Sequence, residues 1–224
     1  MFADKWLLKF LFVMVVAAAV LAGLWLHLRY REKTIPAFGG ADLSVQLADN
    51  AHFLQNDPRW AAERMGNPNG DTLKRAGCTI ASVAMALTNL GHSFDPGQLN
   101  TALTANNGYT SRSWLIWGAI SRVTKGGARA VVYREPSQER LDACLARGDY
   151  PIVKFRIADV IPHWVVVVGK RQGTYYIRDP LIKEPAPIPL TRRTQVLYSV
   201  RCIRKVKAKP SAPAQTPEAS GRTN

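Results

Sequence analysis

Three side chains in this sequence could together activate a nucleophile. Cys78 begins a segment whose apolar residues repeat at helical spacing, His163 opens a β-branched run, and Asp179 closes the next short run. A thiol attacks as its thiolate, and a helix N-terminus with a neighbouring imidazolium is the usual means of lowering a thiol pKa. A carboxylate on the far side of the imidazole would fix its tautomer and direction. The order Cys, His, Asp therefore predicts an activated thiol.

Each of these residues also has a plain structural interpretation. A free cysteine is often a small buried apolar residue, a histidine that opens a strand can be a satisfied structural residue, and Asp179-Pro180 is a common strand exit. The glycine before Cys78 and the helical pattern after it favour the nucleophile. We then expect His163 to act as general base and acid, with Asp179 as its orienting partner.

The elements that must position these residues fall into two groups. Apolar spacing and capping residues predict helices in the first part of the chain, and β-branched alternation predicts strands in the second. Such segregation is typical of an α+β fold, with an N-terminal helical layer packed on a C-terminal antiparallel sheet. The expected helices cover residues 78–90, 96–105, 113–120 and 137–145, and the expected strands 128–133, 151–157, 163–168, 174–178 and 196–203.

The chain is expected to divide into four parts. Residues 1–33 contain an uncharged run, 10–26, at the lower end of the length for a membrane-spanning helix. We interpret it as an uncleaved signal anchor that exports the domain, with a cleaved secretory signal as the alternative. Residues 34–50 are predicted to be a linker, 51–204 the folded domain, and 205–224 a disordered basic tail.

Charge and cysteine content narrow the range of partners. The formal net charge of +14 concentrates at the two ends, and no basic module with interleaved aromatic residues occurs, so nucleic acid is not the expected partner. The three cysteines are scattered and odd in number, which argues against a disulfide framework and a zinc site. A disulfide between Cys144 and Cys202 remains an alternative. We expect neither a metal nor another cofactor.

Four patches, taken in order, resemble the papain-like cysteine peptidases, and more narrowly the family related to bacteriocin-processing, double-glycine leader peptidases. They cover residues 55–60, 77–85, 148–153 and 163–180. The resemblance implies a Cys78-His163-Asp179 triad, with Gln55 donating to the oxyanion beside the backbone N–H of Cys78. It also implies hydrolysis of a peptide or protein substrate. The alternatives are a silent peptide-binding module of the same fold and a peptidoglycan-directed amidase or endopeptidase.

Two further features have a functional and a structural interpretation. Tyr109, Trp114 and Trp117 could line a substrate groove, but an aromatic stripe on a helix is more often part of the core, and we assign these residues to the core. Gly39-Gly40 could be a self-cleavage site, but we interpret it as part of the flexible linker.

Overall fold

The computed structural model describes residues 2–30 and 32–206, which form two compact units on either side of the Thr34–Ile35 bond. The first unit contains helix α1, Phe2–Tyr30, whose described side chains between Lys9 and Trp25 are exposed. Among the described residues, no helix combines the length and the apolar character needed to cross a membrane. The predicted transmembrane span is therefore not confirmed.

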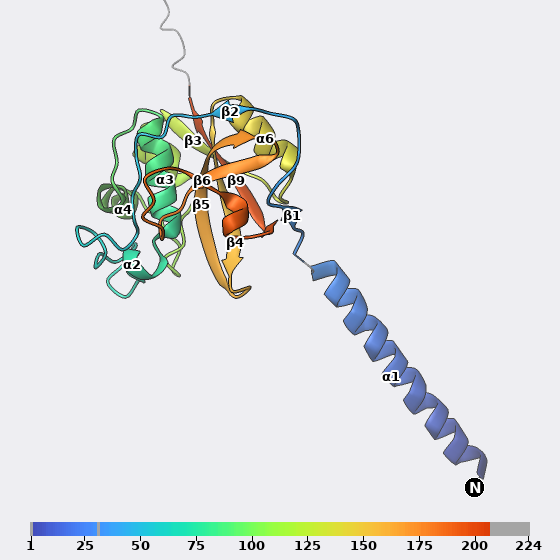
Figure 1. The fold of residues 1–224 in the computed structure, drawn as a ribbon. Coiled ribbons are helices and arrows are strands. Elements are labelled where there is room, and N and C mark those ends of the chain that lie inside the picture. The colour runs from blue at the N-terminus through green and yellow to red at the C-terminus, as the bar shows by residue number, and fades with distance from the viewer. Residues whose placement is uncertain (1, 31, 207–224) are drawn as a thin grey trace, which may run out of the picture. The chain divides into compact units, whose positions relative to one another are not determined.

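The second unit is built on a seven-stranded sheet (Figure 1). Its main path runs β3-β9-β4-β5-β6-β7, β2 pairs with β5, and all pairings are antiparallel. A separate pair joins β1, Ile35–Pro36, to β8, Val196–Leu197. The strands of the large sheet are β2 Val45–Gln46, β3 Ala128–Val132, β4 Tyr150–Ile157, β5 Ile161–Arg171, β6 Thr174–Arg178, β7 Ile188–Pro189 and β9 Ser199–Lys205.

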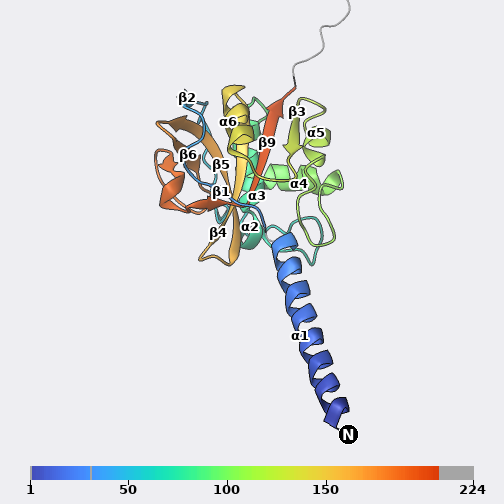
Figure 2. The same ribbon diagram turned by 90° about the vertical axis from the view of Figure 1, so that its right-hand side faces the viewer.

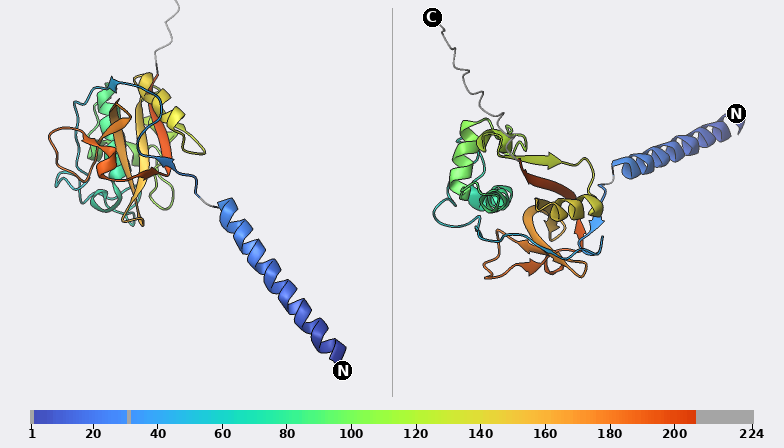
Figure 3. Two further views of the ribbon diagram at one scale, coloured as in Figure 1. Left: turned by 45° about the vertical axis from the view of Figure 1, so that its right-hand side comes forward. Right: turned by 90° about the horizontal axis from the view of Figure 1, so that it is seen from above.

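Helices cover both faces of this sheet, as the views in Figures 2 and 3 show. Helix α3, Cys78–Asn89, packs on one face with α4, Pro96–Ala105, and α5, Ala119–Val123; helix α6, Gln138–Ala146, packs on the other. The short elements α2, Leu73–Ala76, and η1, Leu190–Arg192, complete the described helices. The prediction of helices packed on an antiparallel sheet is confirmed.

The valine run in β5 explains why helices are needed on both sides. Successive side chains of a strand point to opposite faces, so Val166 and Val168 join the core cluster with α3, whereas Val165 and Val167 join the cluster with α6. All four valines are fully buried. A continuous apolar run bounded by turns is typical of such a doubly covered strand.

The ends of two helices follow the capping rules read from the sequence. Asp95 accepts a hydrogen bond from the Gln98 backbone N–H, and the Gln98 side-chain oxygen accepts one from the Asp95 backbone N–H, which completes a capping box at α4. Ser137 caps α6 with a single hydrogen bond, which its hydroxyl accepts from the Arg140 backbone N–H. Both predicted helix starts are confirmed.

Residues 34–50 are not a free linker, which corrects the prediction. Ala37 is fully buried, and Val45 pairs with Lys170 in the sheet. Gly40 has a φ of +79°, and a Cβ placed on it would lie 3.0 Å from the Tyr175 hydroxyl and 3.1 Å from the Lys170 ammonium. The double glycine thus permits a close, fixed backbone approach rather than flexibility.

The helix expected over residues 113–120 is also corrected. Ser113 has a φ of 59°, and the Thr110 N–H donates to the Trp114 carbonyl oxygen at 2.9 Å, so this segment turns back on itself and α5 begins only at Ala119. Tyr109 and Trp117 pack against the core as predicted. Trp114 is 64% exposed, so its assignment to the core was wrong.

Two predictions concern the end of the chain. The strand expected over residues 196–203 is divided at Tyr198 into β8 and β9, which belong to different sheets. Lys205, placed in the tail by prediction, is the last residue of β9. The remainder of the predicted tail beyond Val206 lies outside the described residues.

Candidate active site

Cys78 is the first residue of α3 and is largely buried. The preceding helix α2 ends at Ala76, so the chain restarts as a helix after Gly77. A Cβ on Gly77 would lie 2.8 Å from the Leu73 Cα, which leaves room only for glycine at this restart. Because the first N–H groups of a helix have no acceptor inside it, the Cys78 N–H is oriented for another acceptor. This end of the helix also carries partial positive charge.

His163 lies in β5, beside the strand that leads to Asp179. Its Nε2 is 2.7 Å from Asp179 Oδ1, and the side chain is 3% exposed. The ring packs edge-on against Phe155, its partner in the β4–β5 register, at 5.3 Å between ring centroids. The hairpin of β5 and β6 therefore places His163 and Asp179 in contact although 16 positions separate them.

Cys78 lies close enough to His163 for a hydrogen bond from its side chain, and then its charge, to raise the pKa of the imidazole. Because Nε2 of His163 faces Asp179, the remaining ring nitrogen, Nδ1, is the one available to the thiol. The packing of α3 on β5 brings these two residues together. The three residues predicted for the triad thus form one connected line, from sulfur through imidazole to carboxylate.

Asp179 has partners that the sequence did not reveal. Its Oδ1 also accepts from the Leu181 N–H at 2.8 Å, and its Oδ2 accepts from Arg193 Nε at 2.9 Å. His52 Nε2 lies 3.3 Å from the Asp179 backbone oxygen. Arg193 follows η1, and no local pattern marks it. These contacts occupy both carboxylate oxygens and fix the orientation of Asp179 toward His163.

Gln55 is hydrogen-bonded to one residue shortly before Cys78 and to one directly after Asp179. Its Nε2 donates to the Lys74 carbonyl oxygen at 2.8 Å, and its backbone N–H donates to the Pro180 carbonyl oxygen at 3.0 Å. Gln55 thus connects the segment before Cys78 with the residue after Asp179. The side chain is 5% exposed, and its amide carries a second N–H. Donation of that N–H to an oxyanion remains a prediction.

The electrostatics of the line favour a charged imidazole. Burial by itself lowers the pKa of His163, but the hydrogen bonds to Asp179 and Cys78, with their charges, raise it to about 9. Burial raises the pKa of Asp179, but the hydrogen bond and charge of His163, the Leu181 N–H and Arg193 together hold it below the ordinary value. We therefore expect imidazolium and carboxylate at neutral pH.

This charge state predicts a loss of stability in alkali. Because the folded state raises the pKa of His163 from 6.5 to about 9, the stabilisation from its proton is fully present below about pH 6.5 and is lost as pH rises through about 9. Urea unfolding of the chain between pH 6 and pH 10 measures this. A His163→Gln variant should lack the His163 part of the decline, and an identical decline in both proteins would contradict the assignment.

A cavity of about 380 Å³ is lined by chain neighbours of Cys78 and of His163. It is bounded by Ala76 and Thr79, on either side of Cys78 in the chain, and by Pro162 and Trp164, on either side of His163. Its apolar walls also include Met65, Ile80, Trp114, Leu115 and Trp117.

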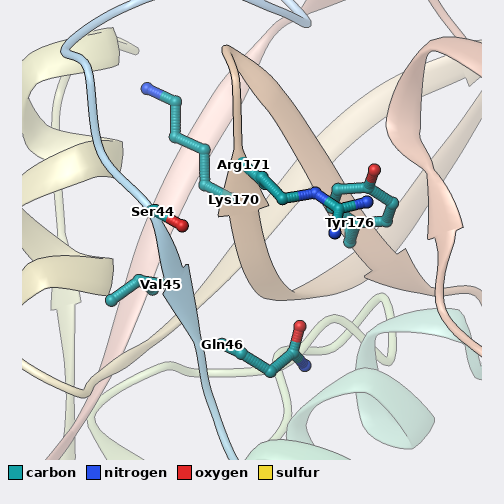
Figure 4. Close-up of a pocket in the computed structure, with 6 residues that line it drawn as sticks. All are labelled: Ser44, Val45, Gln46, Lys170, Arg171 and Tyr176. Atoms are coloured by element: carbon teal, nitrogen blue, oxygen red, sulfur yellow. The ribbon is translucent and has the colours of Figure 1, made fainter.

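A second cavity, of about 340 Å³, lies along β2 and β5 (Figure 4). Arg171 reaches toward Tyr176 there, with its guanidinium 5.9 Å from the ring centroid, whereas the Lys170 side chain points away from both. None of the four predicted site residues lines either cavity, but chain neighbours of Cys78 and His163 line the first one. The cavity beside Cys78 is therefore the candidate for substrate.

The cysteines outside the site are accounted for by a disulfide. Cys144 of α6 and Cys202 of β9 are bonded, which leaves Cys78 as the free thiol. Among the described residues, the one compact group of potential metal ligands is Cys144, Asp149 and Cys202. The disulfide uses both of its sulfurs, and Asp149 is paired with Arg147 and Arg204. This group does not fit a metal centre.

Comparison with known proteins identifies the fold. No protein-family model matches the chain, and no curated protein matches its sequence. Among solved structures, the chain is similar to a candidate C39-like peptidase from Bacillus anthracis, at 17% sequence identity and a TM-score of 0.51. The similarity covers 74% of this chain and 99% of the other. The second unit therefore has the fold of a C39-like peptidase, in agreement with the predicted fold.

Proposed function

We propose that this protein is a cysteine peptidase of the papain-like type, with Cys78 as nucleophile. One observation carries the proposal: buried His163 contacts Asp179 at 2.7 Å and has Cys78, the first residue of α3, as its other side-chain neighbour. A cysteine that opens a helix and contacts an imidazolium has the surroundings of an activated thiol. The solved relative supports the peptidase fold. Specificity for double-glycine leader peptides has no support beyond the sequence resemblance.

The geometry supports a two-step acyl transfer. The Cys78 thiolate attacks the substrate carbonyl carbon, and the resulting oxyanion accepts hydrogen bonds from the Cys78 N–H and the Gln55 amide. His163 gives its proton to the leaving amine as the C–N bond breaks, which leaves a thioester on Cys78. His163 then takes a proton from water as the water attacks the thioester, and the carboxylate product leaves with the thiol restored.

The disulfide indicates where the domain works. Cys144 and Cys202 are both fully buried and bonded to each other. Structural disulfides persist in oxidising compartments and are rare in the cytoplasm. We therefore propose an extracytoplasmic location for the domain. This agrees with export by residues 1–33, whether as an anchor or as a cleaved signal.

We further propose that residues 1–33 tether the protein to a membrane. Helix α1 exposes a run of large apolar side chains that includes Phe12, Val15 and Leu21, and apolar side chains in such a run favour lipid over water. The full chain is expected to remain with membranes after an alkaline carbonate wash, and a chain that begins at Thr34 to be released. Release of the full chain would contradict the tether.

Alkylation of Cys78 tests the proposed chemistry directly. At pH 7 we expect iodoacetamide to modify Cys78 faster than it modifies a free cysteine in an unfolded peptide, because the imidazolium favours the thiolate. Mass spectrometry follows the modification, and a His163→Ala variant serves as control. A Cys78 that reacts no faster than the free thiol would favour the silent peptide-binding module. A peptidoglycan substrate has no specific observation in its favour.

A further inference from the structure

We infer that Arg193 is a positioning residue of the proposed triad, which acts by balancing the negative charge of Asp179 on the side away from His163. The inference rests on the proposed peptidase function. Arg193 Nε donates to Asp179 Oδ2 at 2.9 Å, whereas Asp179 Oδ1 lies 2.7 Å from His163 Nε2. The carboxylate therefore lies between a guanidinium and an imidazolium, and each of its oxygens faces one of them.

Burial makes the contact between Arg193 and Asp179 strong. The Asp179 side chain is fully buried, and that of Arg193 is 24% exposed. The Arg193 guanidinium lies 6.0 Å from the centroid of the Phe155 ring, and the same ring packs against the His163 imidazole at 5.3 Å. Charges in such apolar surroundings are screened less than charges at the surface. A change of charge at position 193 is thus expected to reach His163 through Asp179.

The backbone on both sides of Arg193 is bound to the domain. The Arg193 N–H donates to the carbonyl oxygen of Leu190, a fully buried residue, at 2.9 Å. Two residues further on, the Gln195 carbonyl oxygen accepts from the Ala37 N–H at 2.9 Å, and β8 then pairs with β1. Because the fold already orders this backbone, little conformational entropy is lost when the guanidinium contacts Asp179.

The role of Arg193 follows from the signs of the charges in the site. In the proposed resting state Cys78 is a thiolate, His163 an imidazolium and Asp179 a carboxylate, so two anions share one imidazolium. Arg193 supplies a second cation, and the charges then alternate from sulfur to guanidinium. Without Arg193, the buried group would carry a net negative charge, which favours uptake of a proton by one of the two anions. Either uptake would weaken the attack on substrate.

The other charged and titratable groups that face Asp179 have different partners. Arg178 directs its guanidinium to the Asp49 carboxylate, at 2.7 Å. His52 Nε2 lies beside the backbone oxygen of Asp179 rather than beside its carboxylate. Among the described residues, Arg193 is therefore the cation that faces the second carboxylate oxygen.

The pH dependence of turnover tests this role. The substrate is a peptide found by cleavage-site mapping on a tryptic digest of bacterial proteins, and kcat/KM is measured between pH 4 and pH 9. Arg193→Gln can still donate to Asp179 but has no charge. We expect its kcat/KM to fall about tenfold at pH 7, and the acid limb of its profile, where turnover falls as pH decreases, to move to higher pH.

Two matched variants separate the charge of Arg193 from its bulk. Arg193→Lys keeps the charge without the planar guanidinium, so its acid limb should stay at the original pH. Arg192→Gln is the control, because Arg192 is 58% exposed and its partner is Glu184, at 3.7 Å. Its kcat/KM and its profile should be unchanged. Circular dichroism establishes that each variant is folded.

A measurement without turnover separates this inference from the proposed chemistry. In a Cys78→Ala chain, carbon NMR follows the titration of the Asp179 carboxyl group. Burial raises the pKa of Asp179, whereas His163, the Leu181 N–H and the Arg193 charge lower it. Adding Arg193→Gln to this chain should therefore move the midpoint of the titration to higher pH.

The possible results point to different conclusions. The inference would be overturned if the acid limb of Arg193→Gln coincided with that of the Arg192→Gln control, even in a chain that cleaves peptides. It would also be overturned if the limb moved in Arg193→Lys, which is read alone should Arg193→Gln not fold. A higher Asp179 midpoint in a protein that neither cleaves peptides nor reacts fast with iodoacetamide at Cys78 would overturn the proposed chemistry and keep the contact.

Discussion

Peptide turnover is expected to fall by about 10³-fold to 10⁶-fold in Cys78→Ala, and by a comparable factor in His163→Ala. Without the thiol no acyl-enzyme forms, and without the imidazole the thiol loses its base and the leaving amine its acid. The measurement is kcat/KM on a peptide found by cleavage-site mapping. Circular dichroism and urea unfolding of each variant establish that the loss is not one of folding.

The double variant sharpens this test. Because thiol and imidazole act as one unit, Cys78→Ala with His163→Ala should be about as inactive as either single variant. Asp179→Asn should lose less, since an amide oxygen can still accept the hydrogen bond from His163 Nε2. The proposed triad would be contradicted if the loss of turnover in the double variant equalled the product of the two single losses. It would also be contradicted if His163→Ala kept more than about a tenth of the original turnover.

The largest loss of folding stability is expected from Asp142→Leu. Lys170 is fully buried, and its ammonium donates to Asp142 Oδ1 at 2.8 Å and to the Ala41 carbonyl oxygen at 2.7 Å. The Tyr175 hydroxyl donates to Asp142 Oδ1, and the Ala41 N–H donates to Oδ2, both at 2.8 Å. Removal of the carboxylate leaves a buried ammonium without a counter-charge, which costs about 3–5 kcal/mol in free energy of unfolding.

Urea unfolding of matched variants measures this loss. Asp142→Leu combined with Lys170→Met removes both charges and should recover most of the stability. Asp57→Ala is the control, because its partner Arg59 is exposed and a surface ion pair contributes about 0–1 kcal/mol. If Asp142→Leu and Asp57→Ala lose the same free energy of unfolding, the buried contacts of Asp142 with Lys170 and Tyr175 do not hold residues 35–41 against the domain.

The grouping of Cys78, His163 and Asp179 could be predicted because each of these residues stands at a strong local signal. Cys78 follows a glycine and begins a helical pattern, His163 begins a valine run, and Asp179 precedes a proline. Such signals depend on residues close in sequence. Because β5 and β6 are joined by a tight turn, the contact between His163 and Asp179 also follows from local pairing.

Residues that depend on distant contacts could not be predicted in this way. Arg193 reaches Asp179 only because η1 folds back beside β6. Trp114 has the spacing of a helix, but the left-handed Ser113 turns the chain before a helix can form. The strands β1 and β2 are two residues long and pair with β8 and β5, far along the chain. The Gly-rich sequence around these strands resembles a linker. Only the three-dimensional structure shows that Asp142 and Lys170 bind the backbone of this segment.

The place of β9 in the sheet has a consequence for biosynthesis. This strand is the last described element, yet it lies between β3 and β4 and pairs with both. A nascent chain that ends before Ser199 therefore has two unpaired strand edges in the middle of its sheet, a form prone to aggregation. The domain can complete its sheet only after nearly all of residues 1–205 have been synthesised. A chain delivered across a membrane in an unfolded state would meet that condition, because its sheet closes after translocation.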